Sequence, residues 1–241
     1  MYAFGLGEPG TPAALRIRRD EQTQDLTILR EKGWFSTGQD TRRIEKRDDG
    51  IFYVNLSHTK MPEIDARMEE IAQARGVVFD LRGYPNGNHG VIGHLLTEAD
   101  TSTAWMRIPQ IIYPDHERVA GYSMVGWQLQ PAAPHIEGHV VFLTEGRAIS
   151  YAESFMSFIE HYRFADIVGQ PTAGANGNVN PFTLPGGCVV SWTGMRTVKH
   201  DGSQHHLVGI QPTVPAVRTL PGVREGRDEV LERAIALIHD K

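Results

Sequence analysis

Two short runs rich in branched and aromatic residues, 77–81 and 140–144, constrain the fold more than any other feature of the 241-residue sequence. Runs of this length are typical of strands buried on both faces of a sheet. The first run ends in a loop of glycine, asparagine and proline. The second leads through a short turn into residues 151–161, whose apolar residues have helical spacing. Strands that alternate with helices predict an α/β fold in which helices cover a sheet.

The alternation continues on both sides of these runs. Periodicity predicts a helix over 61–74, with one apolar face formed by Ile64, Met68, Ile71 and Ala72. A further helix is expected to begin in 91–96, and an amphipathic helix over 230–238 closes the chain. Further strands are expected at 51–56, at 165–168, and around residues 189 and 197.

The N-terminal part of the chain has a different pattern. Residues 14–18 and 25–30 alternate apolar and polar side chains, and the polar residues 20–24 join them. This pattern predicts a β-hairpin. The hairpin is either a separate unit or an edge hairpin of the α/β core.

Charge and cysteine content limit the classes of partner. The net charge of −5 comes without a basic cluster, so nucleic acid and anionic membranes are not expected partners. No stretch approaches the roughly 20 apolar residues of a membrane helix.

The single cysteine, Cys188, excludes an internal disulfide and a four-thiolate zinc site, and its apolar surroundings predict that it is buried. A lone cysteine fits both cytosol and cell envelope. The compartment is therefore unknown, and a periplasmic, secreted or cell-envelope parent protein is the expectation.

Ser150 is the residue whose position points most directly to chemistry. It stands between the strand predicted at 140–144 and the helix predicted at 151–161. A turn of that kind can expose a hydroxyl while N–H groups of the helix terminus face its target, which suits acyl transfer. However, Ser150 and Glu153 also form a Ser-x-x-Glu capping box. On this pattern alone, the capping role of Ser150 is favoured.

A set of motifs favours the nucleophilic role of Ser150 over the capping role. These motifs resemble those of the S41 peptidases, the C-terminal processing or tail-specific proteases. The segment Ser150-Tyr151-Ala152-Glu153 is similar to the nucleophile turn of that family. The similarity continues, in the family's order, through segments 79–87, 169–177, 184–187, 208–212 and 226–234. Together these motifs cover about residues 50–238, and on them the chain is identified as a member of the family.

The resemblance implies an α/β core of the ClpP/crotonase-like type, with helices covering the sheet, over residues 33–241. The Gly-Thr-Pro segment before residue 14 and the strand after it are similar to the end of the PDZ domain that precedes such cores. Residues 1–32 are therefore expected to be the C-terminal remnant of a PDZ-like domain, and the chain to be the C-terminal part of a longer protein. The irregular stretch 97–138 is expected to line the substrate side.

The resemblance also implies a polypeptide substrate and a nucleophilic role for Ser150, which would hydrolyse peptide bonds near protein C-termini. In the family, backbone N–H groups hold the oxyanion, and these correspond to Tyr151 and to Asn86 or Gly87. Within the glycine-rich loop 172–180, Asn176 is expected to place the substrate carbonyl or the base. The alternative for Asn176 is that it only braces the turn.

The general base is the open part of the implied site. The family's lysine corresponds to Ala175, and no lysine occurs between Lys60 and Lys199, so the serine–lysine dyad is absent. This departure resembles the tricorn-type branch, whose base is a histidine from a region upstream of the PDZ domain. The acidic partner in that branch falls near Gln211, which can orient a base by hydrogen bonding but carries no charge.

Histidines within the chain are rival bases, because an exposed histidine titrates near neutral pH. His58 follows the first core strand, where its loop can face the site. His205 and His206 lie just before the turn at Gly209. Asp80 and Arg82 are expected to pair with each other and to fix the loop that follows them, rather than to react.

The sequence predicts neither a metal nor a cofactor, because zinc-ligand spacing and a complete phosphate loop are both absent. Oligomerisation is left open. Two other functions compete with peptidase activity. One is a non-catalytic S41-like module that binds a peptide or an apolar ligand. The other is a crotonase-type acyl-CoA enzyme, which is disfavoured because the Ser150 turn has no role in it.

Overall fold

The computed structural model describes residues 7–30, 42–102, 105–112 and 117–240, and the chain divides into two units, Met1–Asp40 and Thr41–Lys241. In the first unit, strands β1 (Pro12–Arg19) and β2 (Gln22–Leu29) pair antiparallel, so the predicted hairpin is confirmed. The domain boundary predicted between residues 32 and 33 lies outside the described residues. The assignment of this hairpin to a PDZ-like domain stays a prediction.

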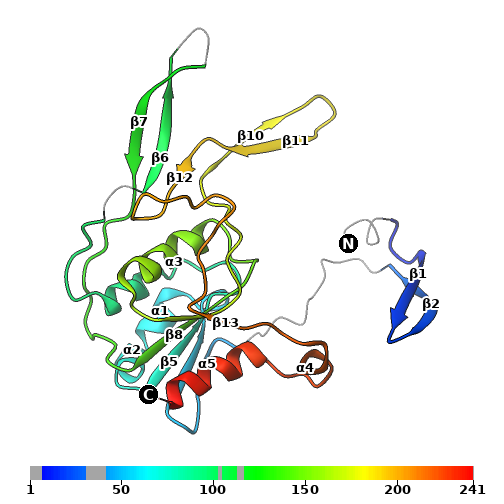
Figure 1. The fold of residues 1–241 in the computed structure, drawn as a ribbon, viewed down its shortest axis with the longest axis horizontal. Helices are drawn as coiled ribbons and strands as arrows, with labels where there is room; N and C mark the ends of the chain where they lie inside the picture. The colour runs from blue at the N-terminus through cyan, green and yellow to red at the C-terminus, as the bar shows by residue number, and fades with distance from the viewer. Residues whose placement is uncertain (1–6, 31–41, 103–104, 113–116, 241) are drawn as a thin grey trace. The chain divides into compact units, whose positions relative to one another are not determined.

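A six-stranded sheet forms the centre of the second unit (Figure 1). Its order is β13-β9-β8-β5-β4-β3, and neighbouring strands run parallel except that β3 is antiparallel to β4. The strands are β3 (Ile44–Lys46), β4 (Ile51–Asn55), β5 (Gly76–Asp80), β8 (His139–Thr144), β9 (Asp166–Gly169) and β13 (Val214–Pro215). The strands predicted at 51–56, 77–81, 140–144 and 165–168 are therefore confirmed as β4, β5, β8 and β9.

Alternate residues of the central strands enter two separate cores, one on each face of the sheet. On one face, Phe52, Phe79 and Phe142 pack with helical segments that precede and follow the strands. These segments are α1 (Met61–Asp65), α2 (Met68–Ala72), the 3-10 helix η2 (His89–Leu95) and α3 (Tyr151–Tyr162). On the other face, Tyr53 and Val141 pack with α5 (Glu229–His239). Helices thus cover both faces, as the alternating pattern predicted.

Two of the predicted helices differ in detail. The helix expected over 61–74 is interrupted at Ala66 and Arg67, where Arg67 has φ −116° and ψ 2°. The segment expected to begin a helix at 91–96 is a 3-10 helix. All four residues of the predicted apolar face over 61–74 are nevertheless buried. Apolar spacing therefore identified the buried face but not the hydrogen-bond pattern of the backbone.

Two hairpins project from the same side of the second unit (Figure 1). One is formed by β6 (Met106–Ile111) and β7 (Val119–Val125), with β12 (Arg196–Thr197) paired to β6. The other is formed by β10 (Val179–Thr183) and β11 (Val189–Thr193), which confirms the strand expected around residue 189. Cys188 is exposed at the start of β11, so the prediction that it is buried is wrong. All five residues of β11 are exposed as well, because the described part of the chain adds no second layer to this hairpin.

A buried ion-pair network holds the carboxyl end of β5. The Arg82 guanidinium donates to both carboxylate oxygens of Asp80, at 3.0 and 2.6 Å, and to both of Asp228, at 2.8 and 2.7 Å. Asp80 also accepts a hydrogen bond from the Tyr53 hydroxyl at 2.7 Å. Asp228 caps α5, which follows the short helix α4 (Leu220–Arg224). The network therefore ties α5 to the loop after β5, and the expected pairing of Asp80 with Arg82 is present.

Loss of Arg82 is expected to be strongly destabilising, because it leaves the buried Asp80 and the partly buried Asp228 without their shared cation. Removing one partner of a buried pair costs about 3–5 kcal/mol, so Arg82→Ala should lower the free energy of unfolding by that amount in a guanidinium titration. Arg227→Ala is the matched control, since Arg227 pairs with Glu232 at the exposed surface. Its midpoint should stay nearly unchanged. Equal effects of the two substitutions would contradict this account of the network.

The same network gives stability a defined pH dependence. Burial disfavours the charged form of Asp228, but its hydrogen bonds with Arg82 outweigh burial and hold the pKa of this carboxyl below its usual value. The contribution of Asp228 to stability is therefore complete above the usual carboxyl pKa of about 4 and is lost as pH falls through the lower folded value. The acid unfolding curve of Arg82→Ala should lack this loss.

Candidate active site

The segments predicted to form the site emerge at one edge of the sheet. Because β4, β5, β8 and β9 are parallel, their carboxyl ends lie at the same edge. Residues 56–59, 81–90, 145–150 and 170–176 follow these four strands. Ser150 stands at the turn between β8 and α3, which is the location that the sequence predicted.

The backbone of Ser150 has an unusual conformation. Its φ of 56° and ψ of −109° lie outside the regions that a residue with a side chain ordinarily adopts. Such strain persists only where the surrounding structure enforces it, and it is typical of a nucleophile held on a sharp strand-to-helix turn. The side chain is half-buried. Ser150 and Glu153 form a capping box, in which the Ser150 side chain faces the Glu153 N–H and the Glu153 carboxylate accepts from the Ser150 N–H.

The Glu153 carboxylate is the buried centre of this turn. It is fully buried and accepts four hydrogen bonds on its two oxygens. One oxygen accepts from the Thr172 hydroxyl at 2.7 Å and the Gly174 N–H at 2.6 Å. The other accepts from the Ala175 N–H at 2.9 Å and the Ser150 N–H at 3.3 Å. One carboxylate therefore fastens the Ser150 turn to the loop that follows β9.

Backbone hydrogen bonds complete this junction. The Ala173 N–H donates to the Ala148 carbonyl at 3.0 Å, and the Ser150 N–H donates to the Ala175 carbonyl at 3.0 Å. Gly174 has φ +67°, and a Cβ there would lie 2.9 Å from the backbone of Leu207. Glycine is thus required at this position both by the left-handed conformation and by the close approach of another segment. The loop 172–176 lies directly against the Ser150 turn, as the order of the motifs predicted.

Charge in this junction is set by burial and by the donors around it. Burial disfavours the charged form of Glu153, but the contacts of His205 and Thr172, among others, outweigh it and place the pKa of this carboxyl below its usual value. His205 is itself buried, with Nε2 3.2 Å from the carboxylate. His205 therefore faces Glu153, whereas His206 is exposed.

The candidate oxyanion donors differ in their availability. The Asn86 N–H already donates to the Leu56 carbonyl at 2.9 Å. The neighbouring Gly87, with φ +68°, donates no backbone hydrogen bond among those of the described residues. The same holds for Tyr151, which is the first residue of α3 and whose N–H has no partner within the helix. The available pair of backbone donors is therefore Gly87 and Tyr151.

Aromatic contacts bring these two donor-bearing segments together. The ring of Tyr151 makes edge contacts with Tyr84 at 5.8 Å and with His89 at 5.7 Å between centroids. The Tyr151 hydroxyl lies 2.7 Å from His89 Nδ1. Trp127, from the segment predicted to line the substrate side, packs against Tyr151 at 5.5 Å. The loop after β5 thus borders the residue that follows Ser150.

Asn176 makes a defined contact within the junction. Its side-chain amide donates to the Ser154 hydroxyl, one helical turn beyond Ser150, at 3.0 Å. The backbone carbonyl of Asn176 accepts a hydrogen bond from the Thr197 hydroxyl at 3.2 Å. This is the bracing arrangement that the sequence left open as an alternative. A role in placing the substrate carbonyl requires the side chain to exchange its bond with Ser154, and that role stays a prediction.

The two other predicted site residues, His58 and Gln211, make contacts with residues other than Ser150. His58 is half-buried in the turn after β4, at the same edge of the sheet, and its N–H donates to the Asn55 carbonyl at 3.2 Å. Gln211 is exposed, and its amide donates to the Val208 carbonyl at 2.6 Å. Among the described residues, neither side chain forms a hydrogen bond with Ser150. Their catalytic roles stay predictions.

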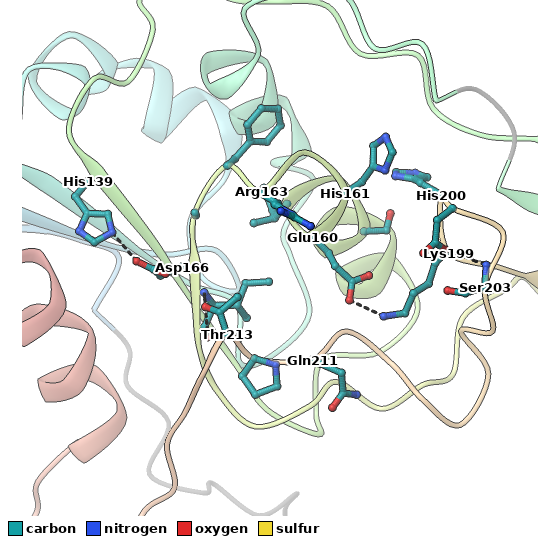
Figure 2. Close-up of a pocket in the computed structure, with 17 residues that line it drawn as sticks. His139, Glu160, His161, Arg163, Asp166, Lys199, His200, Ser203, Gln211 and Thr213 are labelled. Carbon is teal, nitrogen blue, oxygen red and sulfur yellow. Dashed lines mark hydrogen bonds and ion pairs between the residues drawn. The ribbon is translucent and has the colours of Figure 1, made fainter.

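Gln211 also lines a polar cavity of about 860 Å³ beside the C-terminal half of α3. Figure 2 shows the ion pair between Lys199 and Glu160, 2.5 Å apart, in this cavity. The Gln211 amide points away from that ion pair. The cavity is lined by paired side chains such as His139 and Asp166, 2.8 Å apart. Ser150 is not among the residues that line it.

No group of three or more histidine, cysteine, aspartate or glutamate side chains in the described ranges is arranged to hold a metal ion. Within the same ranges, no helix combines the length and apolar character that crossing a bilayer requires.

The strained serine turn at the carboxyl edge of a parallel sheet is an arrangement of α/β proteins that carry a nucleophile. Residues 50–216 match the model of Peptidase family S41, which is more than half of the chain. The chain therefore belongs to peptidase family S41.

Solved structures of peptidases share this fold. A putative peptidase from Parabacteroides merdae is 20% identical over 81% of this chain, with a TM-score of 0.64. The photosystem II D1 C-terminal processing protease is 15% identical over 87% (TM-score 0.53), and the tricorn protease is 17% identical over 96% (TM-score 0.53). The chain spans 63%, 56% and 22% of the lengths of these three chains, respectively. A comparison with curated proteins finds no match.

Glu153→Gln tests the junction. An amide supplies one acceptor oxygen in place of two and turns an NH₂ group toward backbone donors, so part of the hydrogen bonds must be lost. We expect the free energy of unfolding to fall by about 1–3 kcal/mol and the Gly174 and Ala175 amides to exchange hydrogen faster. Glu160→Gln, on the same helix and also an ion-pair partner, is the control and should leave those amides protected. Unchanged exchange at both amides in Glu153→Gln would refute the fastening role.

Asn176→Ala tests the brace. The change removes one hydrogen bond to Ser154, so we expect a loss of about 1 kcal/mol in the free energy of unfolding. Ser154→Ala should cost a similar amount, and the double variant should cost little more than either single one. Additive losses would show that the two side chains do not act together. A fall in turnover per folded molecule of an active form of the protein, without any loss of stability, would instead favour the substrate-placing role.

Proposed function

We propose that the chain is the catalytic part of a serine-type peptidase that hydrolyses peptide bonds near protein C-termini, with Ser150 as nucleophile. The observation that carries the proposal is the strained turn of Ser150, fastened by Glu153 at the carboxyl edge of the sheet. Membership of the S41 family supports hydrolysis of peptide bonds. Similarity to a C-terminal processing protease supports the site of cleavage.

In the proposed reaction, Ser150 Oγ attacks the carbonyl carbon of the scissile peptide and gives its proton to a base. The carbonyl oxygen becomes an anion, which the N–H groups of Tyr151 and Gly87 receive. A preorganised donor of this kind is worth about 3 kcal/mol. The carbon–nitrogen bond then breaks as the base returns the proton to the leaving amine. Water releases the acyl group from Ser150 by the same steps.

The base is proposed to be His58 or a histidine outside these 241 residues, as in the tricorn-type branch. Ala175 has a methyl group at the position of the family's lysine, so it cannot accept the proton. Gln211 is retained as a proposed orienting residue, because an amide can hold an imidazole by hydrogen bonding. Asn176 is retained as a residue that places the substrate carbonyl.

The second candidate function is a non-catalytic S41-like module that binds a peptide or an apolar ligand. The observation in its favour is that, among the described residues, no titratable side chain forms a hydrogen bond with the Ser150 hydroxyl. A hydroxyl without a base is a weak nucleophile. The two functions differ in whether Ser150 can be acylated or phosphonylated.

The chain alone is expected to show little or no peptide hydrolysis, since loss of a general base removes about 10²–10⁴ in rate. A fluorophosphonate should nevertheless modify Ser150, and added imidazole, a small replacement base, should speed the modification. Mass spectrometry of the labelled peptide checks the position. Ser150→Ala should abolish labelling, whereas Ser123→Ala, which changes an exposed serine on β7, should not.

Two outcomes would redirect the proposal. Robust hydrolysis that depends on Ser150 would show that the base is internal, and His58→Ala should then remove it. No modification of Ser150, even at high imidazole concentration, would favour the binding module.

A further inference from the structure

The side chain that follows Ser150 is held rigidly in an aromatic cluster, defined here as Tyr84, His89, Trp127 and Tyr151. The Tyr151 hydroxyl contacts both His89 Nδ1, at 2.7 Å, and the His89 N–H, at 3.3 Å. Three rings surround that of Tyr151 with centroid distances of 5.5 to 5.8 Å. Trp127 is stacked in turn on the buried Phe158 at 5.8 Å. The ring of Tyr151 is therefore fixed at both its edge and its hydroxyl.

Both available oxyanion donors belong to the segments that carry this cluster. Gly87 lies between Tyr84 and His89 in the loop after β5, and the other donor is the backbone N–H of Tyr151 itself. A carbonyl oxygen held between these donors brings with it the α-carbon bonded to the carbonyl carbon. The side chain of that residue branches from this α-carbon. Tyr84 and Tyr151 stand on the two segments that carry the donors, so their rings are the candidates to contact it.

The cluster keeps one apolar surface open. Tyr84 is 53% exposed although its ring contacts Tyr151, and Ile149, immediately before Ser150, is 43% exposed. Among the described residues, no lysine, arginine, aspartate or glutamate contacts the four rings. Burial lowers the pKa of His89, so this ring is neutral at neutral pH. A charged side chain brought here loses water without gaining a partner, whereas an apolar one gains contact area.

We propose that the aromatic cluster is the subsite for the residue that donates the scissile carbonyl, and that it selects large apolar side chains, aromatic ones above all. This rests on the proposed function, because it takes Ser150 and the two N–H donors as the reacting centre. Tyr84 provides the exposed wall of the subsite, and Tyr151 provides the fixed one. The inference adds a substrate class to a site for which the family implies only a polypeptide.

The test is a binding measurement that does not require turnover. Three capped tripeptide acids, acetyl-Ala-Ala-Phe, acetyl-Ala-Ala-Ala and acetyl-Ala-Ala-Asp, carry a carboxylate where the acyl carbonyl sits. They are titrated into the ¹⁵N-labelled chain, with the Gly87, Tyr151 and Trp127 N–H signals as readout. We expect the phenylalanine peptide to bind about tenfold more tightly than the alanine peptide, and the aspartate peptide to bind most weakly.

Variants of an exposed tyrosine give a matched comparison. Tyr84→Ala should reduce the preference for phenylalanine over alanine to about twofold, and Tyr84→Phe should restore it, since the ring rather than the hydroxyl makes the contact. Tyr122→Ala removes a tyrosine that is 39% exposed on β7 and should leave the preference unchanged. Equal affinity for all three peptides, or a preference that survives Tyr84→Ala, would overturn the subsite.

A second arm separates failure of the subsite from failure of the proposed function. Diphenyl phosphonates with a phenylalanine or an alanine side chain are offered to Ser150 in the presence of imidazole. Faster labelling by the phenylalanine reagent, dependent on Tyr84, supports both proposals. Labelling at equal rates keeps Ser150 as nucleophile and overturns the subsite. Tyr84-dependent peptide binding without labelling keeps the subsite and overturns the peptidase.

Discussion

The Glu153 carboxylate is the interaction on which the candidate site depends. A fully buried carboxylate must receive hydrogen bonds on both oxygens, and those available come from the Ser150 turn and the loop after β9. The need to solvate one charge therefore brings together two segments about 20 residues apart. It also explains how Ser150 stays in a strained conformation. The Ser150 N–H donates to both Glu153 and the Ala175 carbonyl, and these hydrogen bonds fix its orientation.

The sheet and the Arg82 network hold this junction in place. Parallel strands place four loops at one edge, and the Arg82 network anchors the loop after β5 to α5 on the far face. The sheet thus fixes where the loops begin, and the loops carry the groups of the candidate site, which is the usual division in α/β folds. The β10–β11 hairpin, all of whose strand residues are exposed, lies outside these cores.

The elements that the sequence predicted well are those whose signal is local. Buried strands and the inner faces of helices are visible as apolar spacing, and the position of Ser150 follows from a strand and a helix that are adjacent in the chain. Glu153 was visible only as half of a capping box, because its partners Thr172, Gly174 and Ala175 are distant in sequence. The prediction that Cys188 is buried is wrong because burial is not a local property of the chain. An apolar run predicts a strand, but whether a second layer covers it is decided by tertiary structure.

Position 175 illustrates what the junction leaves free. Ala175 contributes its N–H to Glu153 and its carbonyl to Ser150, yet its side chain is exposed. The architecture thus uses the backbone of this residue and is indifferent to what is attached to it. A proton acceptor at this place can be lost or regained by exchange of one side chain, with the loop left intact. Within such a framework, the side chain at position 175 can change while the backbone bonds to Glu153 and Ser150 remain in place.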